Sequence, residues 1–135
     1  MLAGLLVAAA LVSLYAYKEY MRKPADLTNS AAAEKVTAAE LYALYSNNED
    51  SANKKYLGKV IEVTGNVAAI ENQQDTSLTI LLGDDKQSGR VSCLVDKRQM
   101  SAAKNIAAGK ALTVKGICTG YLMDVELSRC VIVNK

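Results

Sequence analysis

Residues 1–17 form an uninterrupted apolar run, in which no residue is charged and almost all are hydrophobic. As a helix, a run of this length rises roughly 25 Å, close to the ~30 Å hydrocarbon core of a bilayer. Tyr15 stands where interfacial aromatic side chains belong, and Lys18 can extend its charge toward the headgroups. The sequence therefore predicts a membrane anchor helix over residues 1–23, in contact with the membrane through residues 2–17.

Other interpretations of this run stay open. A cleaved signal peptide is opposed by the lack of basic residues before the run and by Leu14, which occupies the minus-three position of the best cleavage site, ending at Ala16. A lipoprotein signal is opposed because the first cysteine of the chain is Cys93. A buried helix of a soluble domain is opposed because the run has no polar stripe.

The charges on the C-terminal side of the run bear on its orientation. Lys18, Arg22 and Lys23 flank that side, and the positive-inside rule favours the cytoplasm for it. Only the α-amino group opposes this bias at the other end. The sequence predicts a single-pass protein of the inner (cytoplasmic) membrane, with the side of the soluble domain left open by charge alone.

Two segments separate the anchor from the rest of the chain. Pro24 ends the anchor helix, because a residue before proline disfavours helical backbone angles. Residues 24–36 are small and polar and are expected to form a tether. Residues 37–58 are expected to be helical and to pack on the domain that begins at residue 59, since Thr37 and Glu40 have the spacing of a capping box. Their apolar stripe at i, i+3 and i+4 consists of Leu41, Leu44 and Tyr45.

From residue 59 onward the hydrophobic pattern changes to the alternation typical of strands. A helical stretch at residues 97–108 separates the third strand from the fourth, which is the chain order of a five-stranded OB-fold barrel, a Greek-key fold. Gly65 and Gly116 lie inside the first and fourth strands, where a small barrel must bend. The predicted fold is mainly β, an OB-fold barrel over residues 59–135 preceded by helices and a single transmembrane helix; another small five-stranded barrel is the alternative. The strands are expected at residues 59–70, 76–83, 90–96, 111–120 and 124–134.

Two segments carry a resemblance to a known family. They are YLGKVIEVTGNV, beginning at Tyr56, and KGICTGYLMDVELSRCVIV, beginning at Lys115. Together they resemble the tRNA-anti-like OB-fold family over residues 38–134. Relatives in that family include small membrane-tethered bacterial proteins, many of them from the Bacteroidota. The resemblance implies an OB fold without catalytic residues, on the periplasmic side of the membrane.

Charge and aromatic content argue against nucleic-acid binding. Residues 25–135 carry equal numbers of basic and acidic side chains, so the domain lacks the positive charge that drives counterion release from phosphates. The predicted second and third strands contain no aromatic residue on which bases could stack, and only Tyr121 lies near a predicted binding loop. Lys97 and Arg98 form a short basic run typical of a solvated face. An oligonucleotide-binding domain at the membrane is kept as the alternative function.

The residues needed for common enzymatic mechanisms are missing. The chain contains no histidine, which excludes Ser-His-Asp and Cys-His catalysis. Asp84 and Asp85 are adjacent carboxylates, but they stand in a glycine-flanked turn where exposed acids are common. No phosphate-binding loop or nucleophile motif occurs. The sequence therefore predicts a protein that is not an enzyme, with no cofactor and no metal.

The cysteines Cys93, Cys118 and Cys130 all lie in predicted strands. A zinc site is unfavoured, because no CxxC spacing and no histidine is present. Cysteine in a strand commonly acts as a small buried hydrophobic residue. The alternative is a disulfide between Cys118 and Cys130, on strands expected to be antiparallel neighbours, if the register or a bulge brings them together. Such a bond would indicate an oxidising compartment.

A candidate partner face lies on the second and third strands and the loops beside them. If Ile80 and Cys93 point into the barrel, the adjacent Leu81 and Leu94 point out and must be covered. The helices of residues 37–58 would cover them, or a partner protein or second copy of the chain would. The expected partner face consists of Leu81, Leu94, Arg90, Tyr121, Leu122 and Met123. The sequence thus predicts a non-catalytic, membrane-anchored module of the bacterial cell envelope that recognises a protein or small polymer.

Overall fold

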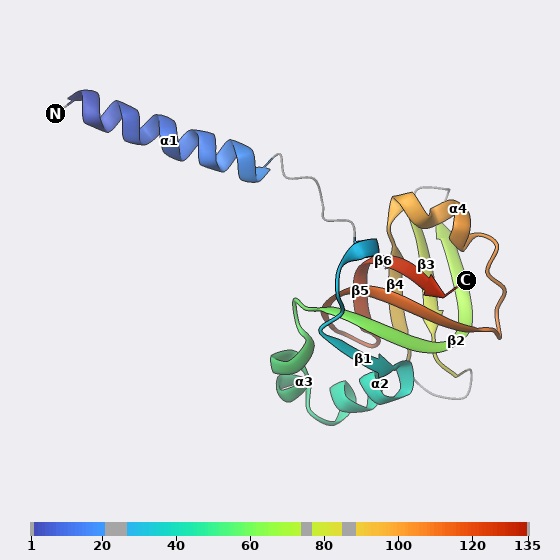
Figure 1. The fold of residues 1–135 in the computed structure, drawn as a ribbon. Coiled ribbons are helices and arrows are strands. Elements are labelled where there is room, and N and C mark those ends of the chain that lie inside the picture. The colour runs from blue at the N-terminus through green and yellow to red at the C-terminus, as the bar shows by residue number, and fades with distance from the viewer. Residues whose placement is uncertain (1, 21–26, 74–76, 85–88, 135) are drawn as a thin grey trace.

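Among residues 2–20, 27–73, 77–84 and 89–134, which the computed structural model describes, five strands close into a barrel (Figure 1). They are β2 (Val60–Gln73), β3 (Ser77–Leu82), β4 (Val91–Val95), β5 (Ala111–Tyr121) and β6 (Val125–Asn134). The strands pair in the order β2–β3–β4–β6–β5, and β5 returns to β2. These pairings are antiparallel except that of β4 with β6. The predicted OB-fold barrel is confirmed.

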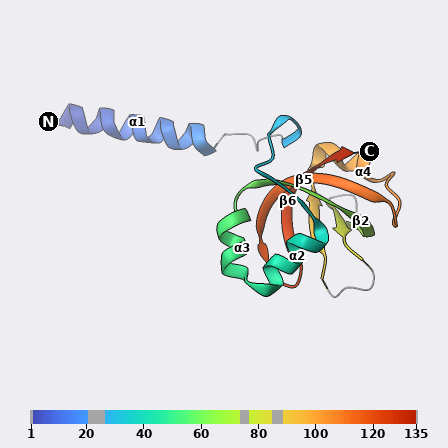
Figure 2. The same cartoon turned by 60° about the horizontal axis from the view of Figure 1, so that its bottom comes forward.

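The other elements of the chain precede the barrel strands or lie between β4 and β5. Those before the barrel are α1 (Leu2–Tyr20), η1 (Leu27–Asn29), β1 (Glu34–Thr37), α2 (Ala38–Asn47) and α3 (Glu49–Tyr56). Those between β4 and β5 are η2 (Lys97–Gln99) and α4 (Met100–Ala103). Figures 1 and 2 both show η1 and α4 at one end of the barrel, and α2 with the β5–β6 hairpin at the opposite end. The helix before β5 is shorter than the predicted stretch of residues 97–108.

The chain just before the helices is fixed to the barrel. Leu27 of η1 is buried, and β1 pairs in parallel with the start of β2, outside the closed barrel. The Lys115 Nζ atom donates hydrogen bonds to the carbonyl oxygens of Thr28, at 3.1 Å, and Ser30, at 2.7 Å. Residues 27–36 therefore differ from a free tether. Their polar composition gave no strand signal, because backbone pairing with β2 does not require apolar side chains.

Helix α2 closes one end of the barrel. The predicted capping box is present: Thr37 Oγ1 accepts a hydrogen bond from the Glu40 backbone N–H at 3.2 Å, and the Glu40 carboxylate accepts one from Thr37 N–H at 3.3 Å. Leu41 and Tyr45 are fully buried and enter the core, whereas Leu44 stays 44% exposed. The apolar stripe of α2 therefore fills the end of the barrel.

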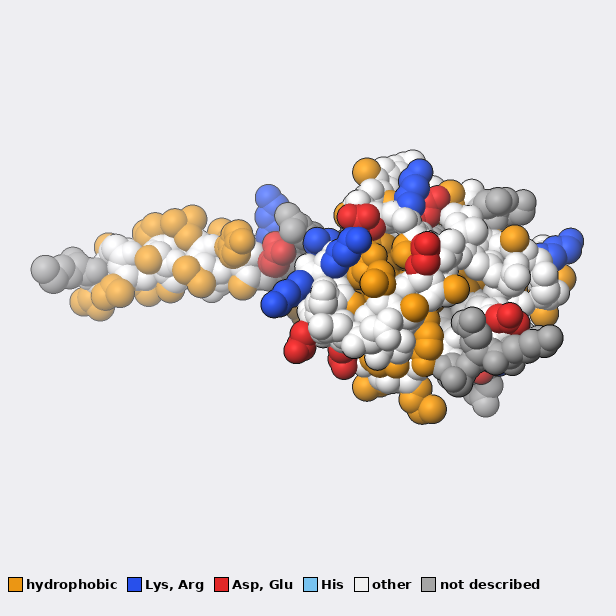
Figure 3. All heavy atoms as spheres, turned by 90° about the horizontal axis from the view of Figure 1, so that it is seen from below, with side chains coloured by type: hydrophobic (Ala, Val, Ile, Leu, Met, Phe, Trp, Pro, Cys, Tyr) orange, Lys and Arg blue, Asp and Glu red, His pale blue; other side chains and the backbone are white. Residues whose placement is uncertain are grey.

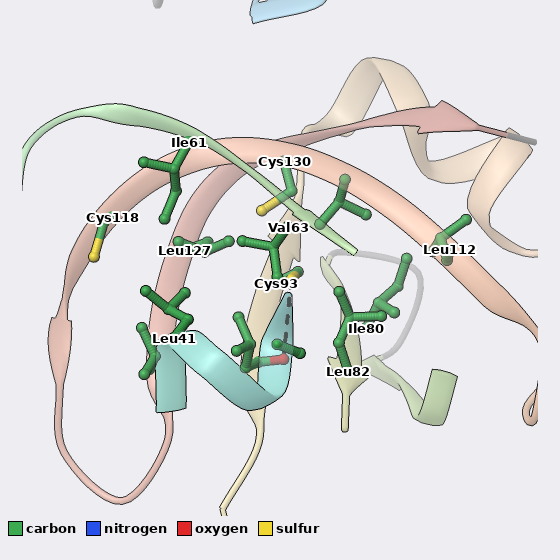
Figure 4. Close-up of a cluster of buried hydrophobic side chains, with 14 of the residues drawn as sticks. Leu41, Ile61, Val63, Ile80, Leu82, Cys93, Leu112, Cys118, Leu127 and Cys130 are labelled. Carbon is green, nitrogen blue, oxygen red and sulfur yellow. Dashed lines mark hydrogen bonds between the residues drawn. The ribbon is translucent and has the colours of Figure 1, made fainter. Parts of the chain in front are cut away.

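Close approach of neighbouring elements, β6 to Gly116 and α2 to Gly65, explains two glycines. A Cβ atom at Gly116 of β5 would lie 2.7 Å from the Cys130 sulfur, and one at Gly65 of β2 would lie 2.9 Å from the Ala38 Cβ atom. Both distances are too short for a side chain. Figure 4 shows how Cys130 and the labelled aliphatic residues of the core converge inside the barrel.

Helix α1 stands apart from this core. None of its residues is buried, and it is long and apolar enough to cross a membrane. This exposure contradicts the interpretation of the run as a buried helix of a soluble domain, because the side chains of a core helix would be covered by protein. An anchor and a signal sequence both fit these properties. Arg22, Lys23 and Pro24, on which the predicted orientation and helix end depend, lie outside the described residues.

Candidate functional site

The β5–β6 hairpin gathers four of the predicted partner-face residues at one end of the barrel. Leu122 and Met123 form its tip and are 78% and 84% exposed. The backbone N–H of Arg90 donates a 2.9 Å hydrogen bond to the Asp124 carboxylate, and the Val125 N–H donates to the Arg90 carbonyl oxygen at 3.0 Å. These bonds hold the tip against the residues that precede β4.

Aromatic rings support the same hairpin. Tyr121, the last residue of β5, stacks on Tyr45 with ring centroids 5.6 Å apart and meets Tyr42 edge-on at 6.0 Å. The Tyr42 ring in turn packs against the backbone of Gly89. A hydrogen bond with Tyr42, together with burial, raises the pKa of Tyr121 above its ordinary value. Because Tyr42 and Tyr45 belong to α2, the helix that closes the barrel also positions the hairpin.

The two leucines of the predicted face do not join this hairpin. Leu81 is only 8% exposed, between Ala69 of β2 and Ser92 of β4 in the sheet register. Leu94 is 44% exposed, and it lines a different surface near η2. Helix α2 packs into the barrel end and leaves Leu94 partly exposed, so the predicted face is divided among the hairpin, the surface near η2 and the buried position of Leu81.

The surface around Leu94 is a groove of about 480 Å³ at the η1 and α4 end. It lies between the start of β3, the end of β4, η2 and the middle of β6. Three cationic side chains and one carboxylate stand around Leu94, with two hydroxyl groups. The residues that line the groove include Ser77, Leu94, Asp96, Lys97, Arg98, Ser128 and Arg129. We call it the β4–β6 groove.

A β-bulge in β6 brings Arg129 to this groove. Cys93 of β4 lies opposite Leu127, but Val95 lies opposite Cys130, so two residues of β6 face one of β4. Arg129 has φ of 52°, the only positive φ at a non-glycine residue among those described. This left-handed conformation costs about 1–2 kcal/mol for residues other than glycine. Bulges re-aim side chains and are frequent beside functional sites.

The charges in the β4–β6 groove are partly paired. The Asp96 carboxylate lies 3.2 Å from the Arg98 Nε atom and accepts a 2.9 Å hydrogen bond from the Arg98 backbone N–H. This contact holds the arginine at the start of η2. Lys97 and Arg129 leave the groove with an excess of positive charge. Sequence reasoning missed this cluster. The signal that could have found it is the interrupted alternation of β6, where Ser128 and Arg129 separate buried Leu127 from buried Cys130.

A third surface carries charges of both signs. It is a groove of about 440 Å³ between β1, α2 and α3. Figure 3 shows hydrophobic side chains gathered on the underside of the molecule, with basic and acidic side chains around them. Leu44 and Tyr56 contribute apolar lining, while Lys55 and Glu40 represent the two charges. The mixture gives this surface no preference for an anion or a cation.

The cysteines are free and buried. The predicted alternative of a Cys118–Cys130 bond is not formed, because the register places Cys118 opposite Leu127. The Cys118 sulfur instead lies 3.2 Å from the Tyr45 hydroxyl. Burial raises the pKa of Cys118, and contact with Cys93 and burial raise that of Cys130.

Within the part of the chain that the structure describes, no three His, Cys, Asp or Glu side chains are placed to hold a metal ion. Asp84 is exposed after β3, and Asp85 lies outside the described residues. The candidate site consists of two surfaces, an apolar hairpin tip at one end of the barrel and the β4–β6 groove at the other.

The closed five-stranded barrel, with its helix between β4 and β5, defines an OB-fold domain of the kind that binds ligands on its strands and loops. The chain belongs to the tRNA_anti-like family, whose model matches residues 1–132. None of the curated proteins matches it.

Solved structures align with this chain at low sequence identity. A lipoprotein of Klebsiella pneumoniae, to which nucleic-acid binding is attributed, aligns over 83% of this chain and 100% of its own, with 16% identity and a TM-score of 0.64. The Stn1–Ten1 complex of S. pombe aligns over 56% of this chain and 59% of its own, with 18% identity and a TM-score of 0.44. Asparaginyl-tRNA synthetase of Pyrococcus horikoshii aligns over 59% of this chain and 20% of its own, with 16% identity and a TM-score of 0.44.

Proposed function

We propose that this protein is a non-catalytic, membrane-anchored OB-fold binding module of the bacterial cell envelope. Its ligand is a partner protein or a small polymer, bound at the hairpin end of the barrel. The observation that carries this proposal is the exposure of two consecutive large apolar side chains, Leu122 and Met123, on a tip that hydrogen bonds hold in place. A rigid tip loses little conformational entropy when it binds.

The chemistry of the tip supports a protein partner. Burying a leucine or methionine side chain contributes about 1.5–3 kcal/mol, so the two together supply useful affinity. The carboxylates of Asp124 and Glu126 lie beside the tip, and Glu126 is exposed. A partner with an apolar pocket and a basic rim complements this arrangement. A second copy of the chain is the other occupant to test, by oligomeric state.

Helix α1 supplies the proposed anchor in the inner membrane. Its length and apolar composition support a single span, and the family resemblance favours a periplasmic position for the barrel. A tether raises the effective concentration of the module near other membrane proteins. A partner in or near the same membrane therefore suits the proposal.

An oligonucleotide is the alternative ligand, favoured by the cations of the β4–β6 groove. Against it, β3 and β4 contain no aromatic residue for base stacking, although stacking contributes about 1–3 kcal/mol per base in single-strand binders. Titration of labelled oligo-dT and oligo-rU into the full chain in detergent at low salt tests this alternative. Tight binding that weakens steeply with salt would replace the protein partner in our proposal.

Affinity purification from native membranes tests the main proposal. The full chain, carrying a photo-crosslinking residue beside the tip, should give one defined cross-linked species. A Leu122→Ser/Met123→Ser variant should lose it, while Val133→Ser, at an equally apolar position 48% exposed near the opposite end, should keep it. Equal capture by both variants would remove the hairpin tip as the binding surface.

A further inference from the structure

The cationic groove and the point where the chain reaches the barrel share one strand. Elements η1 and η2 both contact β6. Lys115, which holds η1, pairs with Val131 of β6, and Arg129 of the β4–β6 groove is two residues from Val131. Figures 1 and 2 place η1 and α4 at the same end of the barrel. The groove therefore lies beside the attachment of the anchor segment.

This attachment limits how far the groove can be from a membrane. Leu27 is buried and Lys115 holds the carbonyl oxygens of Thr28 and Ser30, so the chain is fixed to the barrel from η1 onward. Between Tyr20, the end of α1, and Leu27, seven residue steps span at most about 25 Å. The hairpin tip is farther away, because β5 continues for about 20 Å from Lys115 to its end.

The length of α1 sets the position of its end, a step that rests on the membrane anchoring proposed above. Its 19 residues rise about 28 Å as a helix, which matches the hydrocarbon core of a bilayer. Tyr20 then ends at the headgroup layer. Lys18 stands at the same end, and basic residues there are attracted to anionic lipid.

We propose that the β4–β6 groove binds the phosphate-bearing headgroup of an anionic phospholipid in the membrane that holds α1. Lys97, Arg98 and Arg129 supply the cations, and arginine matches the geometry of phosphate oxygens. The hydroxyl groups of Ser77 and Ser128 add hydrogen-bond donors. Half-exposed Leu94 lies among them and offers apolar contact to the glycerol and upper acyl region.

The strained backbone of Arg129 agrees with this role. A left-handed arginine persists where the surrounding structure holds it, and here its side chain lines the groove. The Asp96 carboxylate, the one acidic group among the described residues that line the groove, is already paired with Arg98.

Fluorescence quenching tests the proposal, because the chain contains no tryptophan. Full-length Leu94→Trp and, as the matched reporter at the hairpin tip, Leu122→Trp are reconstituted into phosphatidylcholine vesicles with or without phosphatidylglycerol. The lipids carry bromine on their upper acyl carbons, which quenches nearby indole. We expect quenching of the tryptophan at position 94, dependent on phosphatidylglycerol, and little quenching at position 122.

Charge variants connect the quenching to the groove. Adding Arg129→Ser to Leu94→Trp should lower the ratio of lipid-bound to lipid-free grooves, measured by the phosphatidylglycerol-dependent quenching, about fivefold, whereas Lys54→Ser, which removes an exposed cation on α3, should not change it. In the unmodified protein, phosphatidylglycerol should protect Lys97, but not Lys54, from acetylation measured by mass spectrometry. This second measurement does not depend on the folding of a tryptophan variant.

Several outcomes would overturn the proposal. The first is equal quenching at positions 94 and 122. The second is quenching at position 94 that does not change with phosphatidylglycerol or with Arg129→Ser. The third is a fluorescence change at position 94 when inorganic phosphate is added in detergent, with no change in anionic vesicles. Flotation of the vesicles separates the two proposals. A chain that does not float with lipid contradicts the anchor, whereas a chain that floats without quenching contradicts only the lipid site.

Discussion

The hydroxyl group of Tyr45 lies 3.2 Å from the sulfur of Cys118, a residue 73 positions later in the chain. The contact joins the helix that closes the barrel to the strand that leads into the exposed hairpin. Tyr45 also stacks on Tyr121, so one side chain connects the core to the exposed hairpin.

Removing this hydroxyl should destabilise the fold. A buried hydrogen bond contributes about 0.5–1.5 kcal/mol, so Tyr45→Phe should lower the melting temperature by roughly 2–12 °C. Thermal unfolding of the full chain, followed by circular dichroism, measures it. In the Tyr45→Phe/Cys118→Ala double variant the combined loss should be smaller than the sum of the two single losses. Strict additivity would show that the pair does not interact.

Alkaline pH should also weaken the fold. Burial raises the pKa of Cys118 from 9.0 and that of Tyr45 from 10.0, and contact with Cys93 and burial raise that of Cys130 from 9.0. The unfolded chain then loses protons first, so stability is constant below about pH 8.5 and falls as pH rises through 9 and 10. Urea unfolding at stepped pH measures this slope. Tyr45→Phe should flatten its upper part; an unchanged slope would contradict our assignment.

Gly116 should not tolerate a side chain. An added Cβ would meet the Cys130 sulfur at 2.7 Å and the Ser128 carbonyl oxygen at 3.1 Å. Gly116→Ala should therefore cost about 1–3 kcal/mol by overpacking. Urea unfolding of the single variant and of Gly116→Ala/Cys130→Ala separates the causes, since removing the sulfur should restore part of the loss. A neutral single variant would refute the close approach.

Arg129 should be replaceable by glycine without loss of stability. Because its φ is 52°, Arg129→Gly relieves strain, whereas Arg129→Val places a β-branched residue where it is strained further. Melting temperatures should therefore be held or raised in the glycine variant and lowered in the valine variant. The reverse order would mean that the bulge relaxes when this residue changes.

Thiol counting should find no bond among the cysteines. All are free and buried in the structure. Alkylation under denaturing conditions without reductant should label Cys93, Cys118 and Cys130, while alkylation of the native protein should label little. Mass spectrometry distinguishes these states. Protein taken from membranes with two cysteines protected from alkylation would require a different arrangement of β4, β5 and β6.

The parts of the fold that depend on side-chain alternation were predictable, and those that depend on backbone geometry were not. The strands of the barrel alternate buried and exposed residues, so their order and approximate limits can be inferred from the sequence. Strand β1 was not predicted, because its four residues pair with β2 through the backbone and show no apolar alternation. The bulge at Arg129 was not predicted, although the sequence carries a sign of it: the alternation of β6 is interrupted where Ser128 and Arg129 separate buried Leu127 from buried Cys130.

The same distinction applies to the candidate site. The hairpin residues Tyr121, Leu122 and Met123 were nominated from their place between two strands, and the structure brings them together with Arg90. Leu94 was nominated as uncovered, and it stays half-exposed, but its basic neighbours come from separate segments that only the folded barrel joins. Leu81 is 8% exposed although it alternates with core residues, so alternation alone did not predict its burial opposite Ala69 of β2 and Ser92 of β4.

The parallel pairing of β1 with β2 has a mechanical consequence. Any pull on the anchor enters the domain through η1 and then β1, whose hydrogen bonds with β2 run across the direction of the chain. Force applied to the chain before η1 would therefore load the β1–β2 hydrogen bonds before it reaches the strands of the closed barrel.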